Sequence, residues 1–260
     1  MFKWLLLITF CLVLVYPIAD ISAQTATPTP TPTPNPLYVR FYYQRGNIFY
    51  ERGKIDDAIA DYTQVIELDP THQSALFRLA QIYTDREEYE NAIALYDQLI
   101  ELSPAHTSAY YYRGYAYQQM GDNDNALADY EQAIAISPDF LDSYIQRGTL
   151  YREIGAYELA IADYTQALSL NPHFPMMHHY RGLAYVGLGD YERALEDYAQ
   201  AIEQDALYTP PYLSRAVAYA ELGQFENAEA DLTTYIELGG TIDEDKKAFF
   251  TALGVTLPED

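Results

Sequence analysis

Apolar side chains recur every three or four residues along most of this chain, in stretches that glycine and proline interrupt at regular intervals. That spacing places one apolar stripe along a helix, so it predicts helices rather than strands. The stretches come in pairs, and a turn that usually carries glycine joins the two members of each pair. These turn glycines are Gly53, Gly121, Gly155, Gly189 and Gly223. The pattern therefore predicts an all-α protein built of helix–turn–helix units.

The units are copies of one 34-residue pattern. Residues 42–70, 110–138 and 144–172 align without insertion, and proline closes four of the units. The predicted repeats are 39–72, 73–106, 107–140, 141–174, 175–208 and 209–242. A single helix pair cannot bury its apolar face, whereas a stack of pairs can, so the fixed period predicts a solenoid.

Three columns of equivalent residues explain how the two helices of a unit pack. Small residues let the helices approach closely, and aromatic side chains fill the wider gaps beside them. The first helix supplies Gly46, Ala80, Gly114, Gly148, Gly182 and Ala216. The second supplies Ala58, Ala92, Ala126, Ala160, Ala194 and Ala228. The aromatic column is Phe49, Tyr83, Tyr117, Tyr151, Tyr185 and Tyr219.

These columns, in this order and at this period, resemble the tetratricopeptide repeat across residues 39–242. The resemblance implies a right-handed superhelical solenoid with a concave groove in which peptide segments commonly bind. It also implies that the terminal segment 243–260 contains a capping helix. Residues 241–254 fit such a helix, with a predicted capping box of Thr241 and Glu244 and an end at Gly254.

One pair of columns departs from the family pattern, which prefers leucine before the small residue of the first helix. Five repeats have arginine there and aspartate sixteen residues later. The pairs are Arg45 and Asp61, Arg113 and Asp129, Arg147 and Asp163, Arg181 and Asp197, and Arg215 and Asp231. The second repeat has Leu79 and Leu95 instead, so both positions change together. This covariation predicts an ion pair between the two helices of one repeat; the alternative is a basic ladder that binds anions.

Tyrosine is used heavily here, with 27 residues, and some of these rings fall on the face that lines the groove in the resembled family. Rigid aromatic residues with hydrogen-bonding tips are typical binding anchors, although the same rings could instead pack against the next repeat. The candidate groove residues are Tyr43, Asn47, Tyr50, Phe77, Gln81, Tyr111, Tyr115, Gln118 and His179. The aromatic residues would be anchors, and the amides would orient a bound backbone.

The expected partner is a protein or peptide segment. A proline-rich, aromatic or cationic segment is favoured, because polyproline helices dock on aromatic surfaces and the net charge is −23. That charge disfavours nucleic acid, which needs lysine and arginine. Two alternatives stay open: a glycan-binding module and an accessory subunit of a cell-envelope enzyme complex. Weak self-association through the Thr-Pro segment of another molecule is also possible.

The N-terminus indicates export. An apolar run at 4–16 follows Lys3 and precedes small residues, which is typical of a secretory signal peptide at 1–23. Residues 24–38 follow as a Thr/Pro-rich linker with an extended, polyproline-like character. Retention by an uncleaved N-terminal anchor is the alternative. The expected location is secreted, periplasmic or cell-surface, with no membrane insertion after cleavage.

No catalytic, cofactor or metal motif emerges from the sequence. His178 and His179 are adjacent, so they do not form a ligand pair on one helix face. Residues 121–129 superficially resemble a calcium loop but lack its glycine and its last glutamate. Nucleotide-binding and hydrolase fingerprints do not occur. We therefore expect a protein that is not an enzyme and carries no cofactor and no metal.

Overall fold

The structure is a computed structural model that describes residues 36–257. All regular elements in this range are α-helices. They are α1 (Pro36–Glu51), α2 (Ile55–Leu68), α3 (Gln73–Asp85), α4 (Tyr89–Leu102), α5 (Thr107–Gln119), α6 (Asn123–Ile136), α7 (Leu141–Glu153), α8 (Tyr157–Leu170), α9 (Pro175–Gly187), α10 (Tyr191–Gln204), α11 (Pro210–Glu221), α12 (Phe225–Glu237) and α13 (Glu244–Leu253). The predicted signal peptide and residues 24–35 of the predicted linker lie outside the described residues.

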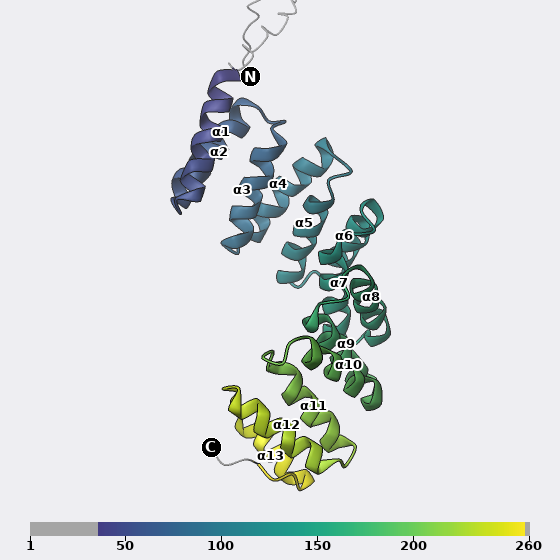
Figure 1. Cartoon of the computed structure of the whole chain (residues 1–260). Helices are drawn as coiled ribbons and strands as arrows, with labels where there is room; N and C mark the ends of the chain where they lie inside the picture. The colour runs from purple at the N-terminus through teal and green to yellow at the C-terminus, as the bar shows by residue number, and fades with distance from the viewer. Residues whose placement is uncertain (1–35, 258–260) are drawn as a thin grey trace, which may run out of the picture.

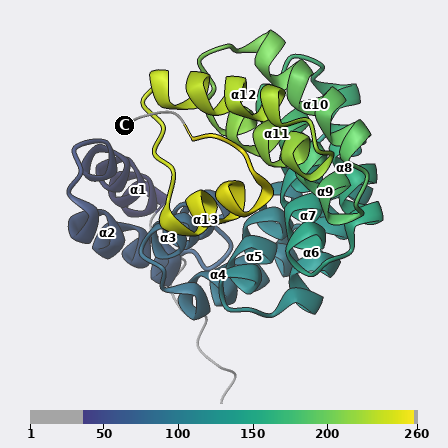
Figure 2. The same ribbon diagram turned by 90° about the horizontal axis from the view of Figure 1, so that it is seen from below.

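The first twelve helices form six antiparallel pairs, and each pair packs on the next (Figure 1). Seen along the stack, the pairs follow a curved path (Figure 2). The odd-numbered helices lie on its inner side, and the even-numbered helices lie outside. The predicted all-α solenoid is thus confirmed. Helix α1 begins at Pro36, ahead of the repeat boundary drawn at residue 39, because proline is well tolerated in the first helical turn.

The small residues lie where the two helices of a pair come closest. A Cβ added to Gly182 would lie 2.5 Å from a ring carbon of Tyr198, which is closer than two carbon atoms can approach. The tyrosine opposite the small residue recurs in five repeats and is fully buried. These residues are Tyr62, Tyr96, Tyr130, Tyr164 and Tyr198. The alanine column of the second helices is also fully buried, as expected from the sequence.

The predicted arginine–aspartate pairs form within single repeats. In each of the five pairs, Nε and Nη2 of the arginine donate hydrogen bonds to the two carboxylate oxygens. Aromatic side chains of the same helix flank the guanidinium groups. Arg147 Cζ, for example, lies 5.9 Å from the ring centroids of both Tyr144 and Tyr151. Much of the aromatic column therefore surrounds these ion pairs, and the basic-ladder alternative is not what the structure contains.

Helix α13 packs on the last pair of helices and buries Phe250 completely against Ala216, Ala220, Ala228 and Leu232. The predicted capping box is wrong, because the helix begins later than expected. Asp243 is the N-cap, and its carboxylate accepts a hydrogen bond from the backbone N–H of Lys246. The predicted end at Gly254 is confirmed, with a φ of 87°. Partly buried Leu213 and Val217 pack against the same cluster, so α13 covers the inner side of the sixth repeat.

Candidate functional site

Aromatic rings from two parts of each repeat interleave along the inner side of the first three repeats. One ring lies on an odd-numbered helix, and its partner lies just before the next odd-numbered helix. The ring centroids of Tyr43 and His72 are 4.7 Å apart, and those of Phe77 and His106 are 5.3 Å apart. Those of Tyr111 and Phe140 are 5.4 Å apart. We call these six residues the aromatic ladder.

The two histidines of the aromatic ladder are held in one tautomer. His72 Nδ1 accepts a hydrogen bond from the backbone N–H of Ala75, and His106 Nδ1 accepts one from Ala109, both at 3.2 Å. A neutral imidazole that accepts at Nδ1 carries its proton at Nε2. Each ring therefore caps a helix with one nitrogen and keeps an N–H donor on the other.

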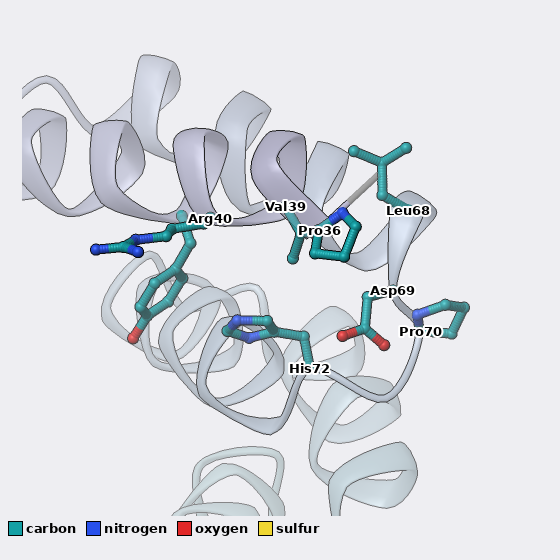
Figure 3. A pocket seen from close by; sticks show the side chains of 8 residues that line it. Pro36, Val39, Arg40, Leu68, Asp69, Pro70 and His72 are labelled. Carbon is teal, nitrogen blue, oxygen red and sulfur yellow. The ribbon is translucent and has the colours of Figure 1, made fainter. Parts of the chain in front are cut away.

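The first of two adjoining cavities lies between the start of α1 and the loop that precedes α3. It has a volume of about 440 Å³. Figure 3 shows Arg40 and Val39 of α1 on one side, with Asp69, Pro70 and His72 on the other. Its lining is largely apolar, with a charged group near each end.

The second cavity, of about 300 Å³, lies between α1, α3 and the residue that caps α5. Tyr43 lines both cavities, so the two are neighbours along the inner side. Phe77 and Gln81 line the second cavity together with Arg78 and His106. Three of the predicted groove residues, Tyr43, Phe77 and Gln81, therefore border open space.

Other predicted groove residues are engaged inside the protein. Tyr62, one of the fully buried tyrosines, donates its hydroxyl hydrogen to Asn47 Oδ1 at 2.7 Å. The Tyr130 hydroxyl donates in the same way to Gln118 Oε1, also at 2.7 Å. A buried hydroxyl without a partner is costly, so one task of these two amides is to satisfy the tyrosine column.

The remaining predicted tyrosines are half-buried. Tyr111 packs against Tyr112, Tyr130 and Phe140. Burial raises the pKa of Tyr111 to about 12, with a smaller contribution from Asp142. The ring of Tyr50 lies 5.9 Å from Arg78 Cζ. These residues leave part of each ring on the inner side, and ligand contact by Tyr50, Tyr111 and Tyr115 stays a prediction.

His179 differs from the other candidates because it is only 6% exposed. Its Nδ1 lies 3.2 Å from the Tyr208 hydroxyl, and its Nε2 lies 2.9 Å from Ser214 Oγ. Burial lowers the pKa of His179 to about 4, and the positive charge of Arg152 adds to the shift. This histidine links the fifth and sixth repeats and lines neither of the two cavities.

The sequence reasoning missed the second ring of each ladder step. A ring residue stands two positions after each repeat-closing proline, and Tyr208, the last residue of the fifth repeat, occupies the equivalent place. The column is His72, His106, Phe140, Phe174 and Tyr208. Its 34-residue period was visible in the sequence, but a mixture of histidine, phenylalanine and tyrosine hides a shared role as a stacking partner.

Residues 36–257 contain no group of three acidic, histidine or cysteine side chains arranged to hold a metal ion. Within the same range, every helix is too short or too polar to cross a membrane.

Five family models match this chain. Those described as tetratricopeptide repeat match residues 43–107, 107–140, 175–206 and 210–238, and one described as TPR repeat matches 148–189. A search of curated proteins found no match.

Solved structures with similar folds include a crystal structure of MamA, with 27% sequence identity and a TM-score of 0.63. That alignment covers 66% of this chain and 94% of MamA. YrrB, described as a TPR protein with an unusual peptide-binding site, is 24% identical over 68% of this chain and 91% of its own, with a TM-score of 0.60. The C-terminal part of a TPR protein from Cytophaga hutchinsonii is 18% identical over 81% of this chain and 83% of that chain, with a TM-score of 0.67.

Proposed function

Because this chain belongs to the tetratricopeptide repeat family, we propose that it is a non-catalytic scaffold whose inner side binds an extended peptide segment of a partner protein. The observation that carries this proposal is the pair of adjoining cavities that share Tyr43. They place aromatic walls and polar side chains from three helices next to each other, as a bound chain several residues long would require.

The lining of the cavities favours a proline-rich or aromatic segment. A polyproline helix has no internal hydrogen bonds, so its carbonyl oxygens are free to accept hydrogen bonds from the surface on which it docks. His72 and His106 supply fixed N–H donors, and Arg78 and Gln81 add further donors around the second cavity. The rings of Tyr43 and Phe77 provide the apolar contact.

A cationic segment is a poorer match than the net charge alone suggests. Arg40 lines the first cavity together with Asp69, whereas Arg78 lines the second cavity with no carboxylate beside it, so a lysine or arginine side chain would meet a like charge in the second cavity. The sixth repeat offers less room, because α13 covers part of its inner side. We therefore place the ligand on the first three repeats and do not favour cationic ligands.

The glycan alternative receives less support from the geometry. Sugar recognition would need flat ring faces that are open to solvent, whereas the ladder rings pack against each other at interplanar angles of 44°, 37° and 81°. Each ladder ring is half-buried and in contact with its partner ring, so less of its face is open to a sugar.

Selection from a random peptide library displayed on phage, with the full chain as bait, tests the proposal. We expect enriched sequences that contain proline or aromatic residues and that bind with little dependence on salt, since charge pairing is not the main attraction. Enrichment of lysine-rich sequences, or of none, would contradict the proposed ligand class. A parallel glycan array measures the alternative directly.

The proposed setting is outside the cytoplasm, and the N-terminal sequence alone supports it. Expression in a bacterial host that secretes proteins, followed by N-terminal sequencing, checks this proposal. A mature protein that begins at Gln24 would support cleavage after Ala23. A chain that keeps its first residues and stays with the membrane would instead support the anchor.

A further inference from the structure

The N-terminal end of the stack exposes a face that is buried in every other repeat. Phe41 is 51% exposed, whereas the residue at its position is buried in the other five repeats. Those residues are Ala75, Ala109, Ser143, Met177 and Pro211. Ile48 is 45% exposed, and its equivalents Ile82, Ala116, Leu150, Ala184 and Ala218 are buried. In each later repeat, the helix pair before it covers these positions.

Two arginines continue this stripe, Arg45 on α1 and Arg52 just after its end, and each lacks a carboxylate that one of its equivalents receives from the preceding repeat. Arg113 Nη1 donates to Asp97 of the preceding repeat at 2.5 Å, while the rest of its guanidinium binds Asp129. Its equivalent Arg45 binds Asp61, but its side chain is 42% exposed, compared with 18% for Arg113.

The second arginine is Arg52, whose equivalent in the next repeat is Arg86. Arg86 Nη2 lies 2.5 Å from Asp56 of the preceding helix α2. Arg52 is exposed in the turn directly after α1, and no earlier helix pair stands within residues 36–257 to supply a carboxylate. Phe41, Arg45, Ile48 and Arg52 follow one another at spacings of four, three and four residues, so they form one continuous stripe, here called the N-terminal stripe.

We propose that the N-terminal stripe docks an acidic amphipathic helix of a partner protein, in the way that the later repeats dock the second helix of the preceding repeat. The chain itself specifies the helix that fits. Asp56 and Asp97 belong to different repeats, but counted within the 34-residue pattern Asp97 stands seven positions after Asp56. Arg52 likewise stands seven residues after Arg45, so one helix with two carboxylates at this spacing could reach both arginines. Helix α4 carries both carboxylates, Glu90 and Asp97, on one helix.

The C-terminal end of a second copy of this chain is a poor occupant of the N-terminal stripe. Five repeats have isoleucine or leucine at one position of the second helix, where it packs toward the next repeat. These residues are Ile59, Ile93, Leu127, Ile161 and Leu195. The sixth repeat has Glu229 there, and this carboxylate accepts a hydrogen bond from the backbone N–H of Thr256 at 2.8 Å. The last repeat thus ends in a polar group that its own tail covers.

A head-to-head pair of copies is also disfavoured. It would bring together two N-terminal stripes in which Arg45 is paired with Asp61 of its own repeat and Arg52 has no carboxylate in the stripe, so neither copy would offer a carboxylate to the other's arginines. An acidic helix instead supplies apolar side chains for Phe41 and Ile48 and a carboxylate for each arginine. This docking surface is on the end of the stack and is separate from the proposed peptide site.

The test uses a labelled peptide with the α4 sequence, residues 89–102, and measures fluorescence anisotropy with the full chain. Since an isolated helix of this length is marginal, Leu95→Lys and Leu99→Glu are introduced and joined by a lactam on the face opposite Glu90 and Asp97. We expect saturable binding that weakens at high salt. A matched peptide with Glu90→Gln and Asp97→Asn should bind about tenfold more weakly or not at all.

Variants of the full chain locate the binding. Ile48→Ser and Arg52→Gln should each weaken peptide binding about tenfold, which corresponds to about 1.4 kcal/mol. Leu159→Ser, at an exposed leucine on α8, should leave binding unchanged. Arg52 is exposed, so Arg52→Gln is expected to fold normally, and circular dichroism verifies this.

Three results would overturn the proposal. They are no saturable binding, equal binding by the two peptides, and equal binding by wild type and Arg52→Gln. Light scattering adds a fourth: a wild-type dimer that Ile48→Ser dissociates would mean that a second copy occupies the stripe.

Discussion

Arg147 on α7 and Asp163 on α8 form a paired hydrogen bond within one repeat, with Nε–Oδ2 and Nη2–Oδ1 distances of 2.9 and 2.7 Å. The carboxylate is almost completely buried, and burial raises the pKa of Asp163 even though Arg147 opposes the shift. The cost of removing this charge from water is therefore a large part of the energetics of the pair. In the second repeat, Leu79 and Leu95 replace both charges together.

A double-mutant cycle at these residues tests their coupling. Arg147→Leu or Asp163→Leu alone should lower the free energy of unfolding by about 3 kcal/mol, because each leaves a poorly solvated charge. The double variant should lose much less, since two leucines reproduce the arrangement of the second repeat. Urea denaturation of the four proteins measures the coupling. Losses that simply add would contradict the account.

The turn of the second repeat offers a second test. Glu87 has a φ of 61°, whereas the equivalent turn positions of the other repeats are glycines such as Gly155, with a φ of 79°. A left-handed backbone destabilises a residue other than glycine by about 1–2 kcal/mol. Substitution by glycine removes this strain, but it also raises the conformational entropy of the unfolded chain, which offsets part of the gain. Glu87→Gly should therefore stabilise the protein by about 0.5–1 kcal/mol.

Gly155→Ala is the matched control for that change. No atom lies within 4 Å of the added Cβ, so its expected destabilisation of about 1 kcal/mol would come from the backbone alone. Denaturation midpoints and hydrogen exchange at the two turns provide the measurement. A less stable Glu87→Gly protein would mean that the glutamate side chain contributes more than the backbone strain costs.

The buried imidazole of His179 predicts how stability depends on pH. Its pKa is lowered to about 4 in the folded protein, from an ordinary value of 6.5. As the pH falls from 6.5 towards 4, the unfolded chain takes up a proton that the folded chain does not. The free energy of unfolding should therefore decrease as the pH decreases from 6.5 to 4, and His179 should account for up to about 3 kcal/mol of that decrease.

His179→Gln isolates that contribution, because glutamine cannot take up the proton. The variant should show a shallower loss of stability below pH 6.5 than wild type, as measured by denaturation at a series of pH values. The comparison is needed because burial raises the pKa of Asp129 and Asp163, which acts in the opposite direction in acid. Identical slopes for wild type and His179→Gln would contradict this assignment.

The stack of repeats and the Arg147–Asp163 pair could be predicted from the sequence because the chain contains six copies of the same repeat, in which equivalent residues have similar surroundings. A position that stays small in every copy must face a close neighbour, and two positions that change together must be in contact. Features that occur only once in the chain were harder to predict. The sequence predicted Thr241 as the N-cap of α13, whereas the nearby Asp243 accepts the hydrogen bond from the first turn in the structure.

The candidate site was only partly predictable. The helix face of Tyr43 and Phe77 follows from the period, but the direction of a buried hydroxyl does not. The hydroxyls of Tyr62 and Tyr130 donate hydrogen bonds to Asn47 and Gln118, two amides that the sequence predicted to contact the ligand. His179 shares a helix face with the ladder residues, yet contacts with Tyr208 and Ser214 bury its ring.

The most direct test of the central claim is the affinity of a library-selected peptide for the full chain and for Tyr43→Ala with Phe77→Ala, measured by anisotropy titration. Loss of both rings should weaken binding at least tenfold, because binding energy concentrates in a few aromatic anchors. Phe225→Ala, at an exposed ring on α12, is the control and should bind as wild type does. Unchanged affinity in the double variant, with circular dichroism confirming that it folds, would contradict a peptide site on the aromatic ladder.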